Sequence, residues 1–183
     1  MVTKMVAIEI PEGVTVTLDG FNVKVKGPKG EVEKNLFHPR VAIKSGNGKV
    51  NVDVKAKKKI KKDKMVTNTF ASHINNLIKG ATDGYEYKLK ICSGHFPMTV
   101  TVSGAEVAVK NFLGEKVPRK AKIAGDVKIE VKGDEIIVTG RNKELVGQAA
   151  AKIEQLTRVV NRDRRIFQDG CYIVSKDGKA VMK

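Results

Sequence analysis

Two stretches of this chain, VTVTLDGFNVKVK at residues 14–26 and MTVTVSGAEVAVK at residues 98–110, repeat one pattern. They lie 84 positions apart, and at the same offset Gly30 falls on Gly114. In both stretches apolar residues alternate with polar ones on either side of an Asp-Gly or Ser-Gly turn, which predicts a β-hairpin. A repeat of this length predicts two copies of one small domain.

A second strand pair and a helix follow the hairpin in each copy. The strand pairs are predicted within residues 41–54 and 127–138, each around a glycine-containing turn. Apolar residues then recur at spacings of three and four across residues 66–78 and 145–156, which predicts one amphipathic helix in each copy. One face of each helix is therefore expected to pack on a sheet.

The last predicted element of each copy is a strand, at residues 85–91 and 166–174. We place the boundary between the copies near residues 81–84, which gives a first domain at residues 1–83 and a second at 84–183. The expected fold class is α+β: two tandem duplicated domains, each a mostly antiparallel sheet packed against one helix.

The composition favours a polyanionic partner. The chain has 35 Lys and Arg against 20 Asp and Glu, a formal net charge of +15, and such an excess is usually retained to bind nucleic acid. A membrane surface is the second candidate, but no amphipathic basic helix and no apolar span supports it. No signal peptide is recognised, so a cytoplasmic protein is expected. Cys92 and Cys171 lack metal-site spacing, so we predict no metal and no cofactor.

The kind of basic residue differs between the two predicted domains. Residues 1–83 carry 16 basic and 8 acidic residues, +8, and residues 84–183 carry 19 and 12, +7. The first excess is largely a lysine run at residues 55–64, whereas five of the seven arginines lie on or after the second helix. Arginine pairs with phosphate through a planar fork and stacks on bases, while lysine is a flexible point charge. We therefore expect the second domain to make the main RNA contacts and the first to be accessory.

The candidate RNA-binding residues come from these two basic regions and from a polar face of the first helix, where hydroxyl, amide and imidazole groups could reach phosphates and 2′-hydroxyls. Solvated faces kept for solubility are the alternative interpretation for the lysine run, for the arginine cluster and for the helix face. The candidates are Lys57, Lys58, Lys59, Lys61, Lys62, Lys64, His73, Asn76, Lys79, Arg141, Asn142, Lys143, Arg158, Arg162, Arg164, Arg165 and Lys176.

No catalytic residues are nominated. The glycines at residues 27–30 lack the spacing of a phosphate-binding loop, and neither a zinc-protease nor a nucleophile-elbow motif occurs. The neighbouring carboxylates Asp134 and Glu135 point to opposite sides of a hairpin. We predict that the chain is not an enzyme. A basic protein that binds nucleic acid without shape preference and a small enzyme acting on RNA remain the alternatives.

Several long motifs of this sequence resemble one protein family. They are GRNKELVGQ at residues 140–148, HFP at 95–97, NFLGEK at 111–116, and a pattern of Val159, Arg162, Arg165, Phe167, Asp169, Gly170 and Tyr172. The chain is similar to the large-subunit ribosomal protein six family, whose eukaryotic members are numbered nine, and the ending of the pattern resembles the archaeal and eukaryotic branch. The first motif favours an archaeal source.

This resemblance implies a ribosomal protein of duplicated fold that binds large-subunit rRNA near the sarcin-ricin loop and the base of the stalk. It also implies neighbouring ribosomal proteins as partners, transient proximity to translation factors, and main RNA contacts in the C-terminal domain. Carried over to this sequence, Arg141, Asn142 and Lys143 open the second helix, and the closing strand is flanked by Arg162, Arg164, Arg165 and Lys176. Cys171 departs from the aliphatic residue usual in the family, which concerns local packing only.

Overall fold

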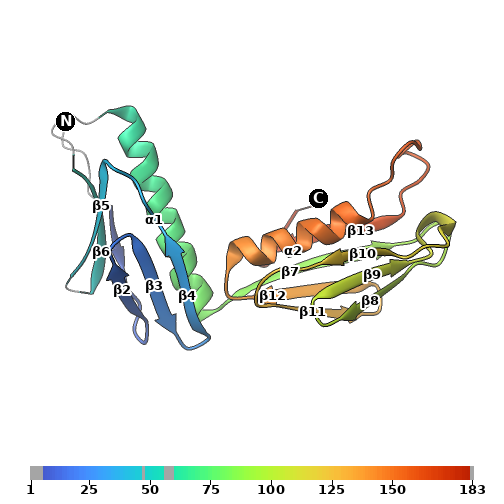
Figure 1. Cartoon of the computed structure of the whole chain (residues 1–183), viewed down its shortest axis with the longest axis horizontal. Coiled ribbons are helices and arrows are strands. Elements are labelled where there is room, and N and C mark those ends of the chain that lie inside the picture. Colours follow the sequence, from blue (N-terminus) through green and yellow to red (C-terminus); the bar gives the residue numbers. More distant parts are fainter. Residues whose placement is uncertain (1–5, 47, 56–59, 182–183) are drawn as a thin grey trace. The chain divides into compact units, whose positions relative to one another are not determined.

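The computed structural model describes residues 6–46, 48–55 and 60–181 (Figure 1). The chain divides into two compact units, Met1–Gly84 and Tyr85–Lys183. Both units run through the same order of elements: one strand, a three-stranded antiparallel sheet, a strand pair and a helix. This shared order confirms the predicted duplicated α+β fold. Each unit differs from the expectation in containing two antiparallel sheets rather than one.

Unit 1 packs a single helix against two three-stranded sheets. One sheet has the order β1-β6-β5 and the other the order β2-β3-β4, and all pairs are antiparallel. The helix contacts strands of both sheets. The elements are β1 (Val6–Glu9), β2 (Thr15–Asp19), β3 (Asn22–Gly27), β4 (Gly30–Asn35), β5 (Val41–Gly46), β6 (Lys49–Val54) and α1 (Lys61–Thr82).

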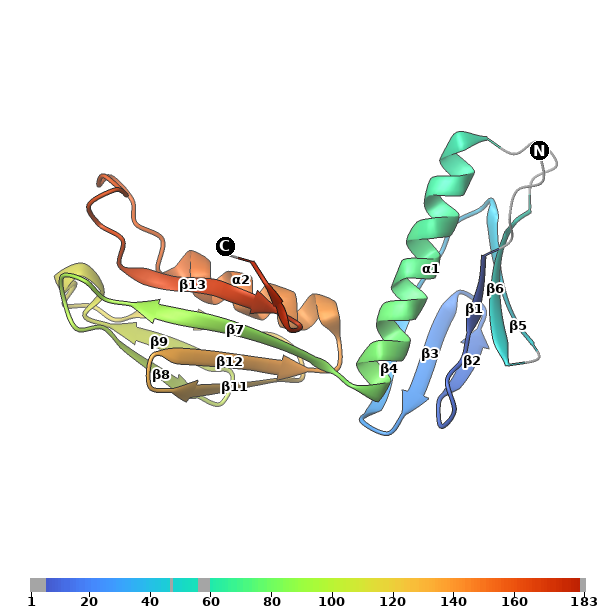
Figure 2. The same ribbon diagram turned by 180° about the vertical axis from the view of Figure 1, so that it is seen from behind.

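Unit 2 repeats this plan with additional strands. A sheet of order β10-β9-β8 faces a larger one of order β11-β12-β7-β13-β14, and α2 contacts strands of both (Figure 2). Its elements are β7 (Tyr85–Cys92), β8 (Thr99–Ser103), β9 (Glu106–Lys110), the short 3-10 turn η1 (Phe112–Gly114), β10 (Arg119–Lys122), β11 (Val127–Lys132), β12 (Glu135–Gly140), α2 (Lys143–Leu156), β13 (Gly170–Lys176) and β14 (Lys179–Ala180).

The repeated stretches form the hairpins β2-β3 and β8-β9, as predicted. Asp19 faces Asn22 and Ser103 faces Glu106, so each turn has two residues. The first of them is Gly20 at φ +62° in one hairpin and Gly104 at φ +59° in the other. Positive φ is the conformation that two-residue hairpin turns require and that glycine adopts without strain.

Each core is built from the alternating apolar residues of the strands and one face of the helix. In unit 1, Val23 and Val25 of β3 pack with Ile74 of α1, and in unit 2, Val107 and Val109 of β9 pack in one cluster with Ile153 of α2. All of these side chains are at most 1% exposed. The equivalent residues of the two repeats therefore fill the small hydrophobic core of each unit in the same way.

Three boundaries differ from the sequence-based expectation. The strand at residues 85–91, predicted to close the first copy, is β7, which pairs with β12 and β13 inside unit 2. The closing strand β13 begins at Gly170 rather than at residue 166, because residues 157–169 form a loop. Helix α1 begins at Lys61, so part of the predicted lysine loop is helical.

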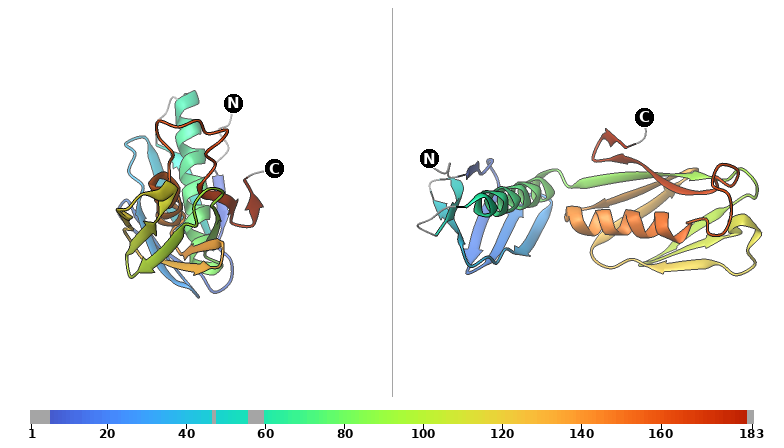
Figure 3. Two further views of the ribbon diagram at one scale, coloured as in Figure 1. Left: turned by 90° about the vertical axis from the view of Figure 1, so that its right-hand side faces the viewer. Right: turned by 90° about the horizontal axis from the view of Figure 1, so that it is seen from above.

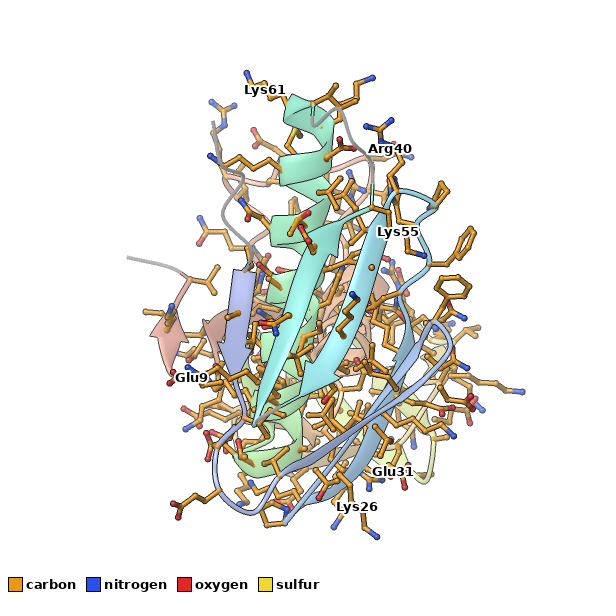
Figure 4. All side chains as sticks on the ribbon, turned by 90° about the vertical axis from the view of Figure 1, so that its left-hand side faces the viewer. Glu9, Lys26, Glu31, Arg40, Lys55 and Lys61 are labelled. Atoms are coloured by element: carbon orange, nitrogen blue, oxygen red, sulfur yellow. The ribbon has the colours of Figure 1, made fainter. Side chains whose placement is uncertain are left out.

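The start of α1 is fixed by one ion pair. Both oxygens of the buried Asp63 carboxylate accept hydrogen bonds from Arg40, at 2.8 Å each, and one also accepts from the Ile60 backbone N–H at 3.0 Å. Figure 4 shows Arg40 at the same end of unit 1 as Lys55 and Lys61. The bonds from Arg40, and then that from Ile60, lower the pKa of Asp63. The carboxylate also lies at the positive end of the helix dipole.

This lowered pKa predicts an acid-sensitive helix. Because the folded state holds the proton less tightly than the unfolded state, Asp63 stabilises unit 1 above the ordinary aspartate pKa of about 3.9, and this stability is lost as the pH falls through the lower folded value. The variant Asp63→Asn should lower the unfolding midpoint at pH 7 and weaken its dependence on acid.

The three tyrosines, Tyr85, Tyr87 and Tyr172, all lie in unit 2, so tyrosine fluorescence reports unfolding of that unit alone. The Asp63→Asn change should therefore appear in the helical circular dichroism and leave the tyrosine transition in place. An unchanged pH dependence of the helical signal would show that the Arg40 pair does not stabilise α1.

Candidate nucleic-acid interface

The loop at residues 157–169 carries the predicted arginine cluster. It leaves the end of α2 and returns to the start of β13 (Figure 3, right). The side chains of Arg158, Arg162, Arg164 and Arg165 are all exposed. Arg165 is held within the loop by Asp163, whose carboxylate accepts from its guanidinium at 2.8 Å and from its backbone N–H at 2.9 Å. These bonds lower the pKa of Asp163, the guanidinium contributing more than the backbone.

The returning end of this loop is anchored by a buried carboxylate. Asp169 is 2% exposed and accepts hydrogen bonds from the backbone N–H groups of Gly94 and His95, and its second oxygen lies 3.2 Å from His95 Nδ1. The His95 ring stacks on Phe167 at 4.9 Å, and the Arg162 guanidinium lies over the same ring at 4.9 Å. The arginine loop is therefore tied to the β7-β8 connection by polar and aromatic contacts.

The outgoing end of the loop is anchored by two further residues. The buried Thr157 hydroxyl accepts a hydrogen bond from the backbone N–H of Cys171 at 2.8 Å, which joins the end of α2 to β13. Cys171 itself is 1% exposed, and burial raises the pKa of its thiol to about 11. The neutral thiol thus packs as a small apolar group.

Arg119 in β10 is a structural arginine that the sequence analysis did not nominate. It donates to the backbone oxygens of Leu156 at 2.9 Å and Arg158 at 3.2 Å, at the end of α2 where carbonyls lack helical partners. Its guanidinium is held by Glu115 at 2.6 and 2.7 Å and lies 4.3 Å from the Phe112 ring centroid. Arg119 therefore positions the start of the arginine loop.

A second group of candidates lies at the other end of α2. Asn142 caps the helix, its side chain accepting from the Glu144 N–H at 2.9 Å, and Lys143 is the first helical residue, as predicted. The Lys143 ammonium lies 5.9 Å from the Tyr85 ring centroid, and Arg141 forms an ion pair with Asp126. The exposed Lys176 belongs to this end as well, because it pairs with Tyr87 near the start of β7.

The structure thus divides the unit 2 candidates into two groups. Helix α2 has 14 residues, so at 1.5 Å per residue about 21 Å separates its ends. Arg158, Arg162, Arg164 and Arg165 lie beyond its C-terminal end, and Arg141, Asn142, Lys143 and Lys176 lie at the other. The expected flanking of β13 by arginines and Lys176 is found, with the two kinds of residue at opposite ends of the strand.

The unit 1 candidates are partly described. Lys57, Lys58 and Lys59 lie outside the described residues, while Lys61, Lys62 and Lys64 are exposed in the first turn of α1. Cations at a helix N-terminus oppose the helix dipole, so helix stability does not explain these three lysines. On the polar face, His73 Nδ1 lies 3.2 Å from Lys34 Nζ, and Asn76 and Lys79 also have intramolecular partners.

Among residues 6–46, 48–55 and 60–181, no cluster of three His, Cys, Asp or Glu side chains could hold a metal ion. No helix within those ranges is long and apolar enough to span a bilayer.

Comparison with known proteins identifies the family. The model of the family described as ribosomal protein L6 matches residues 10–84 and 96–170, one match in each unit. The chain belongs to the ribosomal protein L6 family. The resemblance stated from the sequence motifs is thereby confirmed, and membership in a family of ribosomal proteins supports the prediction that the chain is not an enzyme.

The similar members of the L6 family are archaeal, in agreement with the predicted source. The large ribosomal subunit protein uL6 of Methanosarcina mazei is 51% identical over 169 residues, covering 92% of this chain and 95% of that protein. The uL6 proteins of Methanothrix thermoacetophila and Methanobrevibacter smithii are each 48% identical, covering 92% and 93% of this chain and 95% and 94% of their own lengths.

The Arg119 contacts generate a stability prediction for this L6 family member. Replacing Arg119 by Ala removes two charge-assisted bonds to the backbone carbonyls of Leu156 and Arg158 and should lower the free energy of unfolding of unit 2 by about 1.5–3 kcal/mol. Tyrosine fluorescence during urea unfolding measures this directly.

The neighbouring Lys120 offers a matched control, because its side chain is 59% exposed and its nearest carboxylate, on Glu106, is 3.9 Å away. Lys120→Ala should change the same transition by less than about 1 kcal/mol. Equal effects of the two substitutions would mean that net charge, rather than the helix-end contacts, determines stability.

Proposed function

We propose that this chain is a structural constituent of the large ribosomal subunit that binds large-subunit rRNA near the sarcin-ricin loop and the stalk base, close to the site of translation factors. Neighbouring large-subunit and stalk-base ribosomal proteins are its further partners. The proposal rests on membership in the ribosomal protein L6 family, whose archaeal relatives are named as large-subunit proteins. The sarcin-ricin location rests on the motifs quoted from the sequence.

The observation that carries RNA binding is the set of arginines on the 157–169 loop of unit 2. Within the part of the chain that the structure describes, Arg158, Arg162 and Arg164 form no ion pair with a carboxylate. Their loop is nevertheless held at both ends, by Thr157 and by Asp169. Ordered, uncompensated guanidinium groups fit phosphate bidentately and lose little freedom on binding.

The two ends of α2 suggest how one RNA fold could be distinguished from another. Contacts made simultaneously by the arginine loop and by Arg141 and Lys143 would require phosphates about 21 Å apart. The lysines at the start of α1 form a single group, so they add positive charge but do not require two phosphates at a fixed separation. Unit 2 is accordingly proposed as the main, shape-selective RNA-binding domain and unit 1 as the accessory one.

Electrostatic binding predicts a steep response to salt. Each neutralised phosphate releases counterions, so the logarithm of the binding constant should fall with the logarithm of salt concentration by roughly 0.7–0.9 per phosphate contact. Titrating the full chain with a large-subunit rRNA fragment that contains the sarcin-ricin region, at several salt concentrations, measures this slope. A flat response would contradict phosphate neutralisation as the mechanism.

The division between the units predicts different phenotypes. Arg164→Ala combined with Arg165→Ala should remove the preference for the rRNA fragment over a random duplex competitor, because shape-selective contacts are lost. The triple change of Lys61, Lys62 and Lys64 to Ala should weaken binding to the rRNA fragment and to the random duplex by a similar factor. It should also make binding less dependent on salt concentration. The lysine run at residues 57–59 can be tested in the same way.

The comparison of the two variants also tests the alternative of a basic protein without shape preference. If the wild-type chain binds the fragment and the random duplex equally, the proposed ribosomal RNA specificity is wrong. If both variants lose this preference to the same extent, the chain binds a defined RNA, but unit 2 does not contribute more to the selectivity than unit 1.

A further inference from the structure

A cavity of about 280 Å³ lies between the end of α2, the arginine loop and β13. Its walls come from three consecutive parts of the chain: the end of the helix, the loop that follows it and the start of the closing strand. The lining residues are Glu154, Gln155, Thr157, Arg158, Val159, Arg164, Phe167 and Tyr172. Aromatic, cationic and hydrogen-bonding side chains thus surround one concave site, a combination typical of sites that hold a planar polar ligand.

Two of the lining residues suit the two faces of a planar ring. Tyr172 is half-buried and fixed by its hydroxyl, which donates to the Gln168 backbone oxygen at 3.1 Å. Burial raises the pKa of Tyr172. Arg164, whose guanidinium is planar, lines the same cavity. Phe167, by contrast, is already covered by His95 and Arg162 and serves as a wall.

The polar lining groups are available for a ligand. Within the described residues, the side chains of Glu154, Gln155, Arg158 and Arg164 form no hydrogen bond or ion pair. A carboxylate and an amide at one side of the cavity can meet the hydrogen-bonding edge of a base, and guanidinium groups can meet its phosphate. Arg158 and Glu154 remain unpaired although they are only four positions apart on the chain.

We propose that this cavity binds a single unpaired RNA base, extruded from its helix and stacked between Tyr172 and Arg164. Guanine suits the site best, because its N1–H and N2–H groups are two adjacent donors that a carboxylate, here that of Glu154, accepts together. Arg158 contacts the phosphate of the same nucleotide. The inference rests on the proposed function, since it gives a nucleotide-level contact to the loop assigned there to RNA.

The test uses the full chain and five short RNA hairpins of identical stem. One hairpin is fully paired and the others carry a single bulged A, C, G or U, and affinities are compared by fluorescence anisotropy at one salt concentration. The bulged hairpins should bind more tightly than the paired one, with the bulged G tightest. Base stacking on a protein side chain is the source of this advantage.

Two substitutions examine the site without removing a buried group. Arg164→Lys keeps the charge but lacks the planar surface. It should weaken binding of the bulged hairpins roughly 5- to 150-fold, which corresponds to about 1–3 kcal/mol for loss of stacking, and weaken binding of the paired hairpin by a much smaller factor. Glu154→Gln should abolish the preference for G over A. The matched control Lys132→Arg changes an exposed residue of β11 that does not line the cavity. It should change neither the affinity for bulged hairpins nor the preference for G.

The outcomes separate this inference from the proposed function. Equal binding of bulged and paired hairpins by the wild-type chain, or a bulge advantage that survives Arg164→Lys, would overturn the base site. If the base site is overturned but the chain still selects the sarcin-ricin fragment over random duplex, the proposed function stands. In that case the cavity would be expected to hold a side chain of a neighbouring protein. If the chain does not select that fragment, the proposed function fails independently of the hairpin result.

Discussion

Burial of one apolar face of a single helix constrains everything else in each unit. A folding unit of fewer than 100 residues can bury only a small hydrophobic core. Here Ile74 in α1 and Ile153 in α2 are both fully buried, and each helix contacts two sheets. Most charged residues therefore lie on the exposed positions of the strands, on the far face of the helix, at its two ends and in the loops. The candidate RNA-binding cations gather at the helix ends, where the lysines of α1 and the arginines beyond α2 lie.

Acidic residues decide which of these cations remain available. Asp126 pairs with Arg141, Asp163 with Arg165 and Glu115 with Arg119, so three of the unit 2 arginines are partly neutralised within the fold. A paired guanidinium is held in place, but it must share or surrender its carboxylate when it meets a phosphate. Arg158 and Arg164 carry no such partner in the described chain. The loop therefore carries one arginine held by a carboxylate, Arg165, next to arginines that have no such partner in the described chain.

Local elements were predictable from the sequence, whereas the pairing of strands that are distant in the sequence was not. Alternation around Asp19-Gly20 and Ser103-Gly104 identified both hairpins because the turn and the strands are adjacent in the chain. The strand at Tyr85 was also recognised, yet it was described as closing the first copy although it falls within the second predicted domain. Alternation reveals a strand without naming the strands that pair with it. Its partners, β12 and β13, lie more than 40 residues away. The loop before Gly170 was read as strand because Ile166 and Phe167 are apolar.

The same distinction holds for the candidate interface. Clustered arginines and a family resemblance identified the arginines between residues 158 and 165 from the sequence. Arg119 is isolated in the sequence, and its role follows only from its contact with carbonyls 37 and 39 residues away. The cavity beside Tyr172 was equally invisible, since its walls come from a helix end, a loop and a strand. Charge predicts where a polyanion is attracted, but selection among RNAs depends on spacing, and spacing is a property of the folded chain.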